Sequence, residues 1–161
     1  MNATTVAVVH VRVETRKGFA EVREGLERRL PRFNLDTLPS LLAEPQEAKR
    51  QLEAVAGPGG FMLFATVDHG SLLAVLGESR KAVQYVLGNP LIAVQMTRHH
   101  LAAGLYAPLR LLVYEDEEGK TRLEYDKPSS LFGQFRDDRV DAVAAVLDRK
   151  VEELVAAAVR Q

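Results

Sequence analysis

Arg110, Tyr114 and Tyr125 offer one cationic and two phenolic side chains within a short stretch of the chain. They belong to segments 108–116 and 121–126, whose β-branched and aromatic residues predict the two strands of a hairpin. A guanidinium binds carboxylates and phosphates, and apolar pockets with a few polar groups are typical of ligand sites. If the three side chains share one face, they predict a pocket for a partly apolar, anionic small molecule.

The pairing of the hairpin decides whether these side chains meet. Symmetrical closure about Glu118-Gly119 would set Tyr114 opposite Leu123 and Leu112 opposite Tyr125, with Arg110 on the same face. A one-residue bulge would move the second strand's side chains to the other face. In the alternative interpretation the tyrosines belong to the core and the arginine pairs with a neighbouring carboxylate.

His69 is the second candidate for chemistry, because it follows Asp68 directly. A histidine beside a carboxylate can act as a general acid or base. The alternative is that Asp68 accepts hydrogen bonds from backbone amides at a turn. His99-His100 does not predict a metal site, because adjacent histidines on a helix diverge by about 100°. No metal and no cofactor is therefore expected.

The composition limits the class of protein. The chain has 161 residues, 47% of them hydrophobic and 27% charged, which predicts one globular domain spanning residues 1–161. A net charge of −1 argues against binding to nucleic acid or an anionic membrane. The absence of cysteine excludes disulfides and thiol chemistry. No apolar run reaches the ~18 residues of a membrane span, so a cytoplasmic location is expected.

The elements that must position these residues follow from periodicity. Strands are predicted at 3–14, 61–68, 108–116 and 121–126. Segment 82–87 is short enough to fit a strand or a helix, and Val83, Tyr85 and Val86 favour a strand. Helices are predicted at 19–30, from Pro45 to about 55, from Pro90, and from Asp137 to near the end. Segment 32–44 is predicted to be irregular, with room for a helical turn, and 72–76 fits either a strand or a helix.

The last helix carries a long apolar stripe. Its members recur at alternating steps of four and three residues: Val140, Ala144, Leu147, Val151, Leu154 and Ala158. The spacing favours a helix packed across a sheet, and a coiled-coil seam is the alternative. Because the strands mostly adjoin turns, we predict an α+β fold with an antiparallel sheet, helices on one face and a long C-terminal helix.

The region from about residue 61 to 131 resembles the prokaryotic domain of unknown function 302. The resemblance is carried by Val67-Asp68-His69, Leu87-Gly88-Asn89-Pro90 and the run from Ala107 to Asp116, with Gly119, Tyr125 and Pro128. It departs from the usual pattern at Gly70-Ser71-Leu72-Leu73. Segment 32–44 and the long tail helix exceed the minimal domain.

The resemblance implies a fold similar to the TATA-binding protein, with a curved antiparallel sheet, and a homodimer. It implies no activity, because the family has none established. Our first hypothesis is a domain that binds a small molecule with Arg110, Tyr114, Tyr125 and His69. The alternatives are an enzyme with His69 as acid/base and Arg110 as anion clamp, or a structural homodimeric module.

Overall fold

The computed structural model describes residues 1–160, and its centre is an open five-stranded antiparallel sheet. The strands are β1 (His10–Thr15), β2 (Met62–Asp68), β3 (Ala82–Gly88), β4 (Leu109–Glu115) and β5 (Thr121–Asp126), in the order β1-β5-β4-β3-β2. Each neighbouring pair is antiparallel. The predicted α+β class is therefore confirmed.

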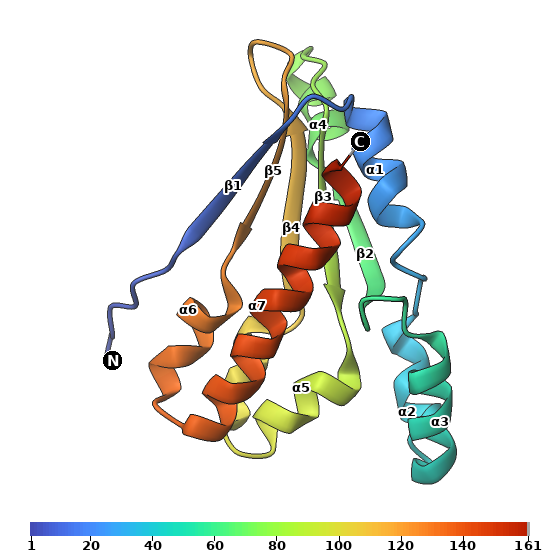
Figure 1. Cartoon of the computed structure of the whole chain (residues 1–161), viewed down its shortest axis with the longest axis vertical. Coiled ribbons are helices and arrows are strands. Elements are labelled where there is room, and N and C mark those ends of the chain that lie inside the picture. The colour runs from blue at the N-terminus through green and yellow to red at the C-terminus, as the bar shows by residue number, and fades with distance from the viewer. Residues whose placement is uncertain (161) are drawn as a thin grey trace.

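Helices cover one face of this sheet. Figure 1 shows α7 lying across the strands with α1 beside it, while α2 and α3 lie beyond β2. The α-helices are α1 (Phe19–Glu27), α2 (Leu38–Leu41), α3 (Pro45–Val55), α4 (His69–Leu72), α5 (Pro90–Thr97), α6 (Pro128–Phe132) and α7 (Asp138–Val159). Segments Leu35–Thr37, Leu73–Leu76, Leu101–Tyr106 and Gly133–Phe135 form 3₁₀ turns. The predicted long C-terminal helix is α7.

The core lies between the sheet and α7, where alternate apolar side chains of the strands pack against the apolar stripe of the helix. On β3, β4 and β5 alternate residues are buried, as expected for strands with one covered face. All six members of the predicted stripe on α7 are buried within the same chain. The stripe therefore packs across the sheet, and it is not available as a coiled-coil seam.

Several predicted boundaries shift. The first strand begins at His10, so residues 3–9 lie outside it. Segment 72–76 is helical, because α4 continues into a 3₁₀ turn. Segment 32–44 contains a 3₁₀ turn followed by α2. α5 begins as predicted, with Asn89 accepting a hydrogen bond from the amide of Leu91. Within residues 1–160, no helix combines the length and apolarity needed to cross a bilayer.

Candidate functional site

The β4–β5 hairpin closes one residue away from the symmetrical pairing. Leu111 pairs with Tyr125 and Leu112 pairs with Glu124. Gly119 has a φ of +75°, and its amide donates to the carbonyl of Asp116 at 3.0 Å. The loop is therefore a three-residue turn that ends in a left-handed glycine bulge. The predicted pairing is wrong, because this bulge adds one residue to the loop.

The corrected pairing separates the two tyrosines. Tyr125 faces the helices and is buried, and burial raises the pKa of its hydroxyl. Arg110 and Tyr114 point to the open face of the sheet, on the other side. Arg110 is exposed and forms no side-chain ion pair with any residue between 1 and 160. The three predicted site residues therefore do not share one cavity.

His69 lies far from the predicted anion clamp. It is the exposed first residue of α4, after the end of β2, whereas Arg110 lies at the opposite end of the sheet. Asp68 caps α4 by accepting from the amide of Ser71 at 2.8 Å, and this bond holds its pKa below the usual value. The alternative interpretation of Asp68 as a turn residue is confirmed.

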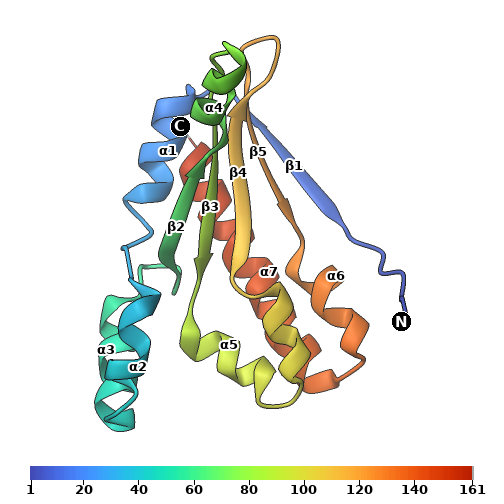
Figure 2. The ribbon, with the colours of Figure 1, turned by 180° about the vertical axis from the view of Figure 1, so that it is seen from behind.

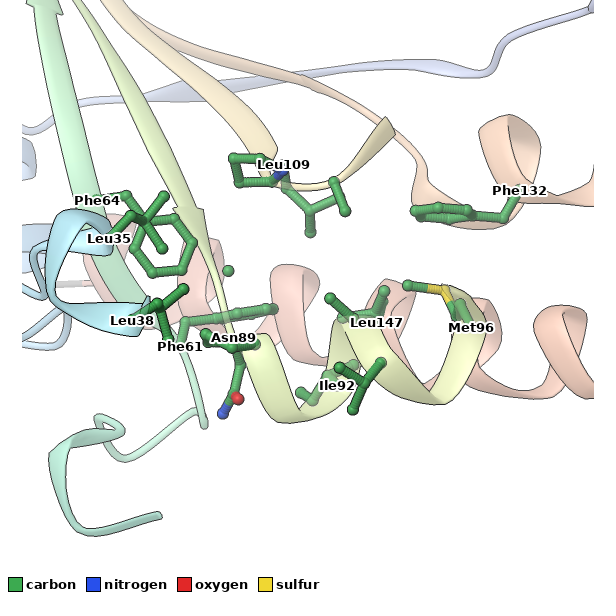
Figure 3. A pocket seen from close by; sticks show the side chains of 16 residues that line it. Leu35, Leu38, Phe61, Phe64, Asn89, Ile92, Met96, Leu109, Phe132 and Leu147 are labelled. Carbon is green, nitrogen blue, oxygen red and sulfur yellow. The ribbon is translucent and has the colours of Figure 1, made fainter. Parts of the chain in front are cut away.

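A different cavity opens at the end of the sheet where β3 and β2 meet α5. Its volume is about 240 Å³. Figure 3 shows Phe61, Phe64, Leu35 and Leu38 on one side and Met96, Phe132 and Leu147 on the other, with Leu109 between them. The lining thus comes from β2, α2, α5, β4, α6 and α7, which meet only in the folded chain.

Asn89 is the one polar side chain in this lining, and its polar atoms are already bonded. Its oxygen caps α5, and its amide nitrogen donates to the carbonyl of Gly60 at 2.8 Å. In Figure 3 the amide points away from the apolar side chains. Among residues 1–160, no charged side chain lines the cavity, so it matches an apolar ligand surface.

Gly88 allows two parts of the lining to approach each other. A Cβ at this position would lie 3.1 Å from Phe64 and 3.6 Å from Pro108. The glycine therefore lets the phenyl ring of Phe64 pack against the backbone at the end of β3. Pro108 follows Ala107 through a cis peptide bond, and both residues line the cavity.

A cluster that sequence reasoning missed lies on the open face around Glu124. Its carboxylate accepts from the hydroxyl of Tyr114 at 2.7 Å, from Nε2 of His10 at 2.8 Å and from Nε of Arg12 at 2.5 Å. Burial opposes ionisation of Glu124, but these three donors outweigh it and lower the pKa to about 2. His10 also contacts Asp126 at 2.9 Å, and the bonds to Asp126 and then Glu124 raise its pKa.

This cluster is a cross-strand network that ties the edge strand β1 to the sheet. The signal in the sequence was the alternation of charged and apolar residues along both strands, which puts His10, Arg12 and Glu124 on one face. The described residues contain no group of three or more histidine, cysteine, aspartate or glutamate side chains arranged to hold a metal ion.

The family model of the domain of unknown function DUF302 matches residues 36–158. The chain belongs to this family. A crystal structure of an uncharacterized conserved DUF302 protein from Bacillus stearothermophilus is similar over 94% of this chain and 98% of its own, with a TM-score of 0.66 at 22% sequence identity. No curated protein matches the chain.

The DUF302 match is wider than the resemblance seen in the sequence. It begins at residue 36 and ends at 158, so it includes most of segment 32–44 and nearly all of α7. These regions belong to the family domain, although the local pattern suggested additions to it. The two segments Gly88-Asn89-Pro90 and Ala107-Pro108-Leu109, which carry much of the resemblance, both line the apolar cavity.

Proposed function

We propose that this DUF302 domain binds an apolar small molecule, or the apolar part of a larger one, in the cavity between the end of the sheet and α2, α5 and α7. The observation that carries the proposal is the composition of the lining. Its one polar side chain, Asn89, is bonded elsewhere, and no charge is present. A cavity without polar partners disfavours ordered water and favours apolar groups.

The size of the cavity limits the ligand. An apolar cavity of about 150 Å³ holds one benzene ring. The 240 Å³ here accommodates a ring with a short substituent, or a chain of similar volume. Each buried methylene contributes about 0.8 kcal/mol, which is about a fourfold gain in affinity. A charged group of the ligand would have to remain at the opening, because nothing inside the cavity can pair with it.

The geometry gives less support to the predicted enzyme. An acid/base histidine and an anion clamp must both reach one substrate. His69 and Arg110 lie at opposite ends of the sheet, and neither lines the cavity. The structural-module hypothesis required an apolar face on α7, and that face is buried against the sheet. Binding of a small apolar molecule is therefore the function that the geometry supports best.

The experiment uses N-phenyl-1-naphthylamine, a neutral dye that fluoresces in apolar surroundings. The cavity has room for its naphthyl group, and the phenylamino group would remain at the opening. We expect saturable binding, and we expect straight-chain alcohols to displace the dye with affinity that rises about fourfold per methylene until the cavity is full. Ala93→Phe fills the cavity from α5 and should abolish binding. Ala142→Phe makes the same change at an exposed position of α7 and should leave binding intact.

Circular dichroism and thermal unfolding of both variants show whether each remains folded. A folded Ala93→Phe protein that still binds the dye with native affinity contradicts the proposed site. A native protein that shows no saturable binding and no dependence on chain length contradicts the proposed function itself.

A further inference from the structure

Segment 34–44 forms one wall of the apolar cavity, and it lies outside the core. It consists of the 3₁₀ turn Leu35–Thr37 and the short helix α2, followed by the connection to α3. Leu35 and Leu38 lie about one helical turn apart, and both line the cavity, as Figure 3 shows. Figure 2 shows α2 and α3 beyond the end of β2, where neither covers a face of the sheet.

This segment is only weakly attached to the rest of the cavity wall. No residue of its 3₁₀ turn or of α2 is buried. Its hydrogen bonds run within the segment, as from the amide of Thr37 to the carbonyl of Asn34, except that the carbonyl of Glu44 accepts from the amide of Ala48 in α3. Within residues 1–160, no hydrogen bond joins it to the sheet, α5, α6 or α7. Its hold on the cavity therefore depends on the apolar contacts of its leucines.

Both ends of the segment are anchored. Before it, the amide of Phe33 donates to the carbonyl of Leu63 in β2, and the amide of Leu63 donates to the carbonyl of Pro31, at 2.9 Å each. After it, Ala48 and Leu52 hold α3 in place, and each is 2% exposed. A stretch that is fixed at two ends and weakly held between them has the attachment that lids of binding sites need in order to move.

The opening of the cavity lies beside this segment. Among the lining residues, Leu35, Val94 and Pro108 are exposed, and the others are at least partly buried. These three mark the rim, and they come from segment 34–44, α5 and the residue before β4. Leu35 therefore belongs both to the lining and to the rim. Movement of the segment widens the opening without disturbing the core.

We propose that segment 34–44 is a lid, which opens to admit the apolar ligand and closes over it through Leu35 and Leu38. The inference rests on the proposed binding function and adds the route by which the ligand enters and leaves. Opening breaks no hydrogen bond to the sheet or to α5, α6 and α7, so it costs only the apolar contacts of two side chains. Closure over a ligand removes apolar surface from water on the exposed side of the cavity. The lid therefore sets the rates of exchange, whereas the fixed walls set the affinity.

Stopped-flow fluorescence of N-phenyl-1-naphthylamine measures both rates. Mixing the protein with increasing concentrations of the dye gives the association rate, and displacement by excess 1-decanol gives the dissociation rate. For the native chain we expect the observed association rate to level off at high dye concentration, because entry then waits for the lid to open.

Three variants distinguish the lid from a fixed wall. Asn34→Ala removes the oxygen that accepts from the amide of Asp36 and caps the 3₁₀ turn, and Asn34 does not line the cavity. Both rates should rise about fivefold, with Kd unchanged within about twofold, because a looser lid opens more often with or without the dye. Asp68→Ala removes a similar cap from α4 and should change neither rate. Ile92→Ala shortens a wall on α5, so it should raise the dissociation rate at least about fivefold without changing the association rate.

Hydrogen exchange followed by mass spectrometry tests the lid without a substitution. Saturating dye should slow exchange of the amides in residues 35–43 at least about tenfold, because the ligand stabilises the closed lid against local opening. Residues 69–76 are the control, since they also form one short helix and a 3₁₀ turn but do not line the cavity. Their exchange should stay the same.

Failure of the lid and failure of the binding function give different results. A native chain without saturable dye binding contradicts the binding function, and the lid with it. Saturable binding with rates that a folded Asn34→Ala protein leaves unchanged contradicts the lid alone. Saturable binding that leaves the exchange of residues 35–43 unchanged leads to the same conclusion.

Discussion

The hydroxyl of Tyr114 lies 2.7 Å from a carboxylate oxygen of Glu124, and this bond runs diagonally from β4 to β5 across the open face. The same carboxylate accepts from His10 and Arg12 on β1. Glu124 therefore joins three strands through one side chain that is 13% exposed, in addition to the backbone pairing of β1 with β5.

Glu124→Gln should lower the free energy of unfolding by about 1–3 kcal/mol at neutral pH, because hydrogen bonds to a charged acceptor are lost from a largely buried site. Urea denaturation followed by circular dichroism measures the change. Glu117→Gln, in the exposed hairpin turn, removes the same charge and should change stability by less than about 0.5 kcal/mol. Equal midpoints for the two variants would contradict this role of Glu124.

The fall in the free energy of unfolding at acidic pH should also depend on Glu124. Its folded pKa of about 2 lies below the usual 4.5, so its contribution is present above pH 4.5 and is lost as the pH falls from 4.5 towards 2. The native protein should therefore lose more stability than Glu124→Gln across this window, since the other carboxylates are common to both. Urea midpoints at a series of acidic pH values test the difference, and parallel curves would refute it.

His10 should give the opposite pH dependence. Its pKa is raised above 6.5 by the bonds to Asp126 and Glu124, so the stability it adds is complete below pH 6.5 and is lost as the pH rises through the raised value. The stability difference between the native chain and His10→Gln should stay constant below pH 6.5 and shrink as the pH rises through the raised pKa. Thermal unfolding in a buffer series measures it. A difference that stays constant would show that folding does not raise the pKa of His10.

Gly70→Ala should destabilise the protein by about 2–3 kcal/mol, because overpacking against backbone cannot be relieved by a rotamer change. A Cβ there would lie 2.2 Å from the carbonyl oxygen of Arg80 and 2.7 Å from the amide nitrogen of Ala82. Gly133→Ala is the control, since its Cβ would meet open space in a helical backbone and should be neutral or slightly stabilising. Equal unfolding midpoints would contradict the close approach of α4 to β3.

Asn89→Ala should cost about 2 kcal/mol, because α5 loses its cap and the carbonyl of Gly60 loses a donor. The dye should also bind less tightly, since α5 forms one wall of the cavity. Asp68→Ala removes a similar cap from α4, which does not line the cavity, and leaves both hydrogen bonds of Asn89 in place. Unchanged dye affinity in a folded Asn89→Ala protein would show that the cap does not position this wall.

Local patterns predicted the elements well where periodicity or capping was strong. The stripe of α7 and the Asn-Pro start of α5 agree with the structure, because apolar spacing and caps act within a few residues. The predicted pairing of the hairpin was wrong because the sequence Glu117-Glu118-Gly119 fits both a two-residue and a three-residue turn. Gly119 adopts a positive φ in the longer turn, and a shift of one residue moves Tyr125 to the other face.

The cavity could not be predicted from local patterns. Its lining comes from distant parts of the chain, for example from Leu35, Asn89 and Leu147. Neighbouring members of this set are more than fifty positions apart in the sequence, so they meet only through tertiary packing. The signal that was present was the resemblance at residues 88–90 and 107–109, which both line the cavity. The pattern shared with the family lies at this cavity, whereas the polar side chains suggested a site on the hairpin.

The strand order has a consequence for synthesis of the protein. β1 pairs only with β5, and the bond from His10 to Asp126 spans 116 positions. At translation rates of about 5–20 residues per second, synthesis of the 116 positions that separate the two residues takes roughly 6–23 seconds. During that interval the backbone N–H and C=O groups of β1 have no strand to pair with. A chaperone that binds the new chain would therefore matter most at β1.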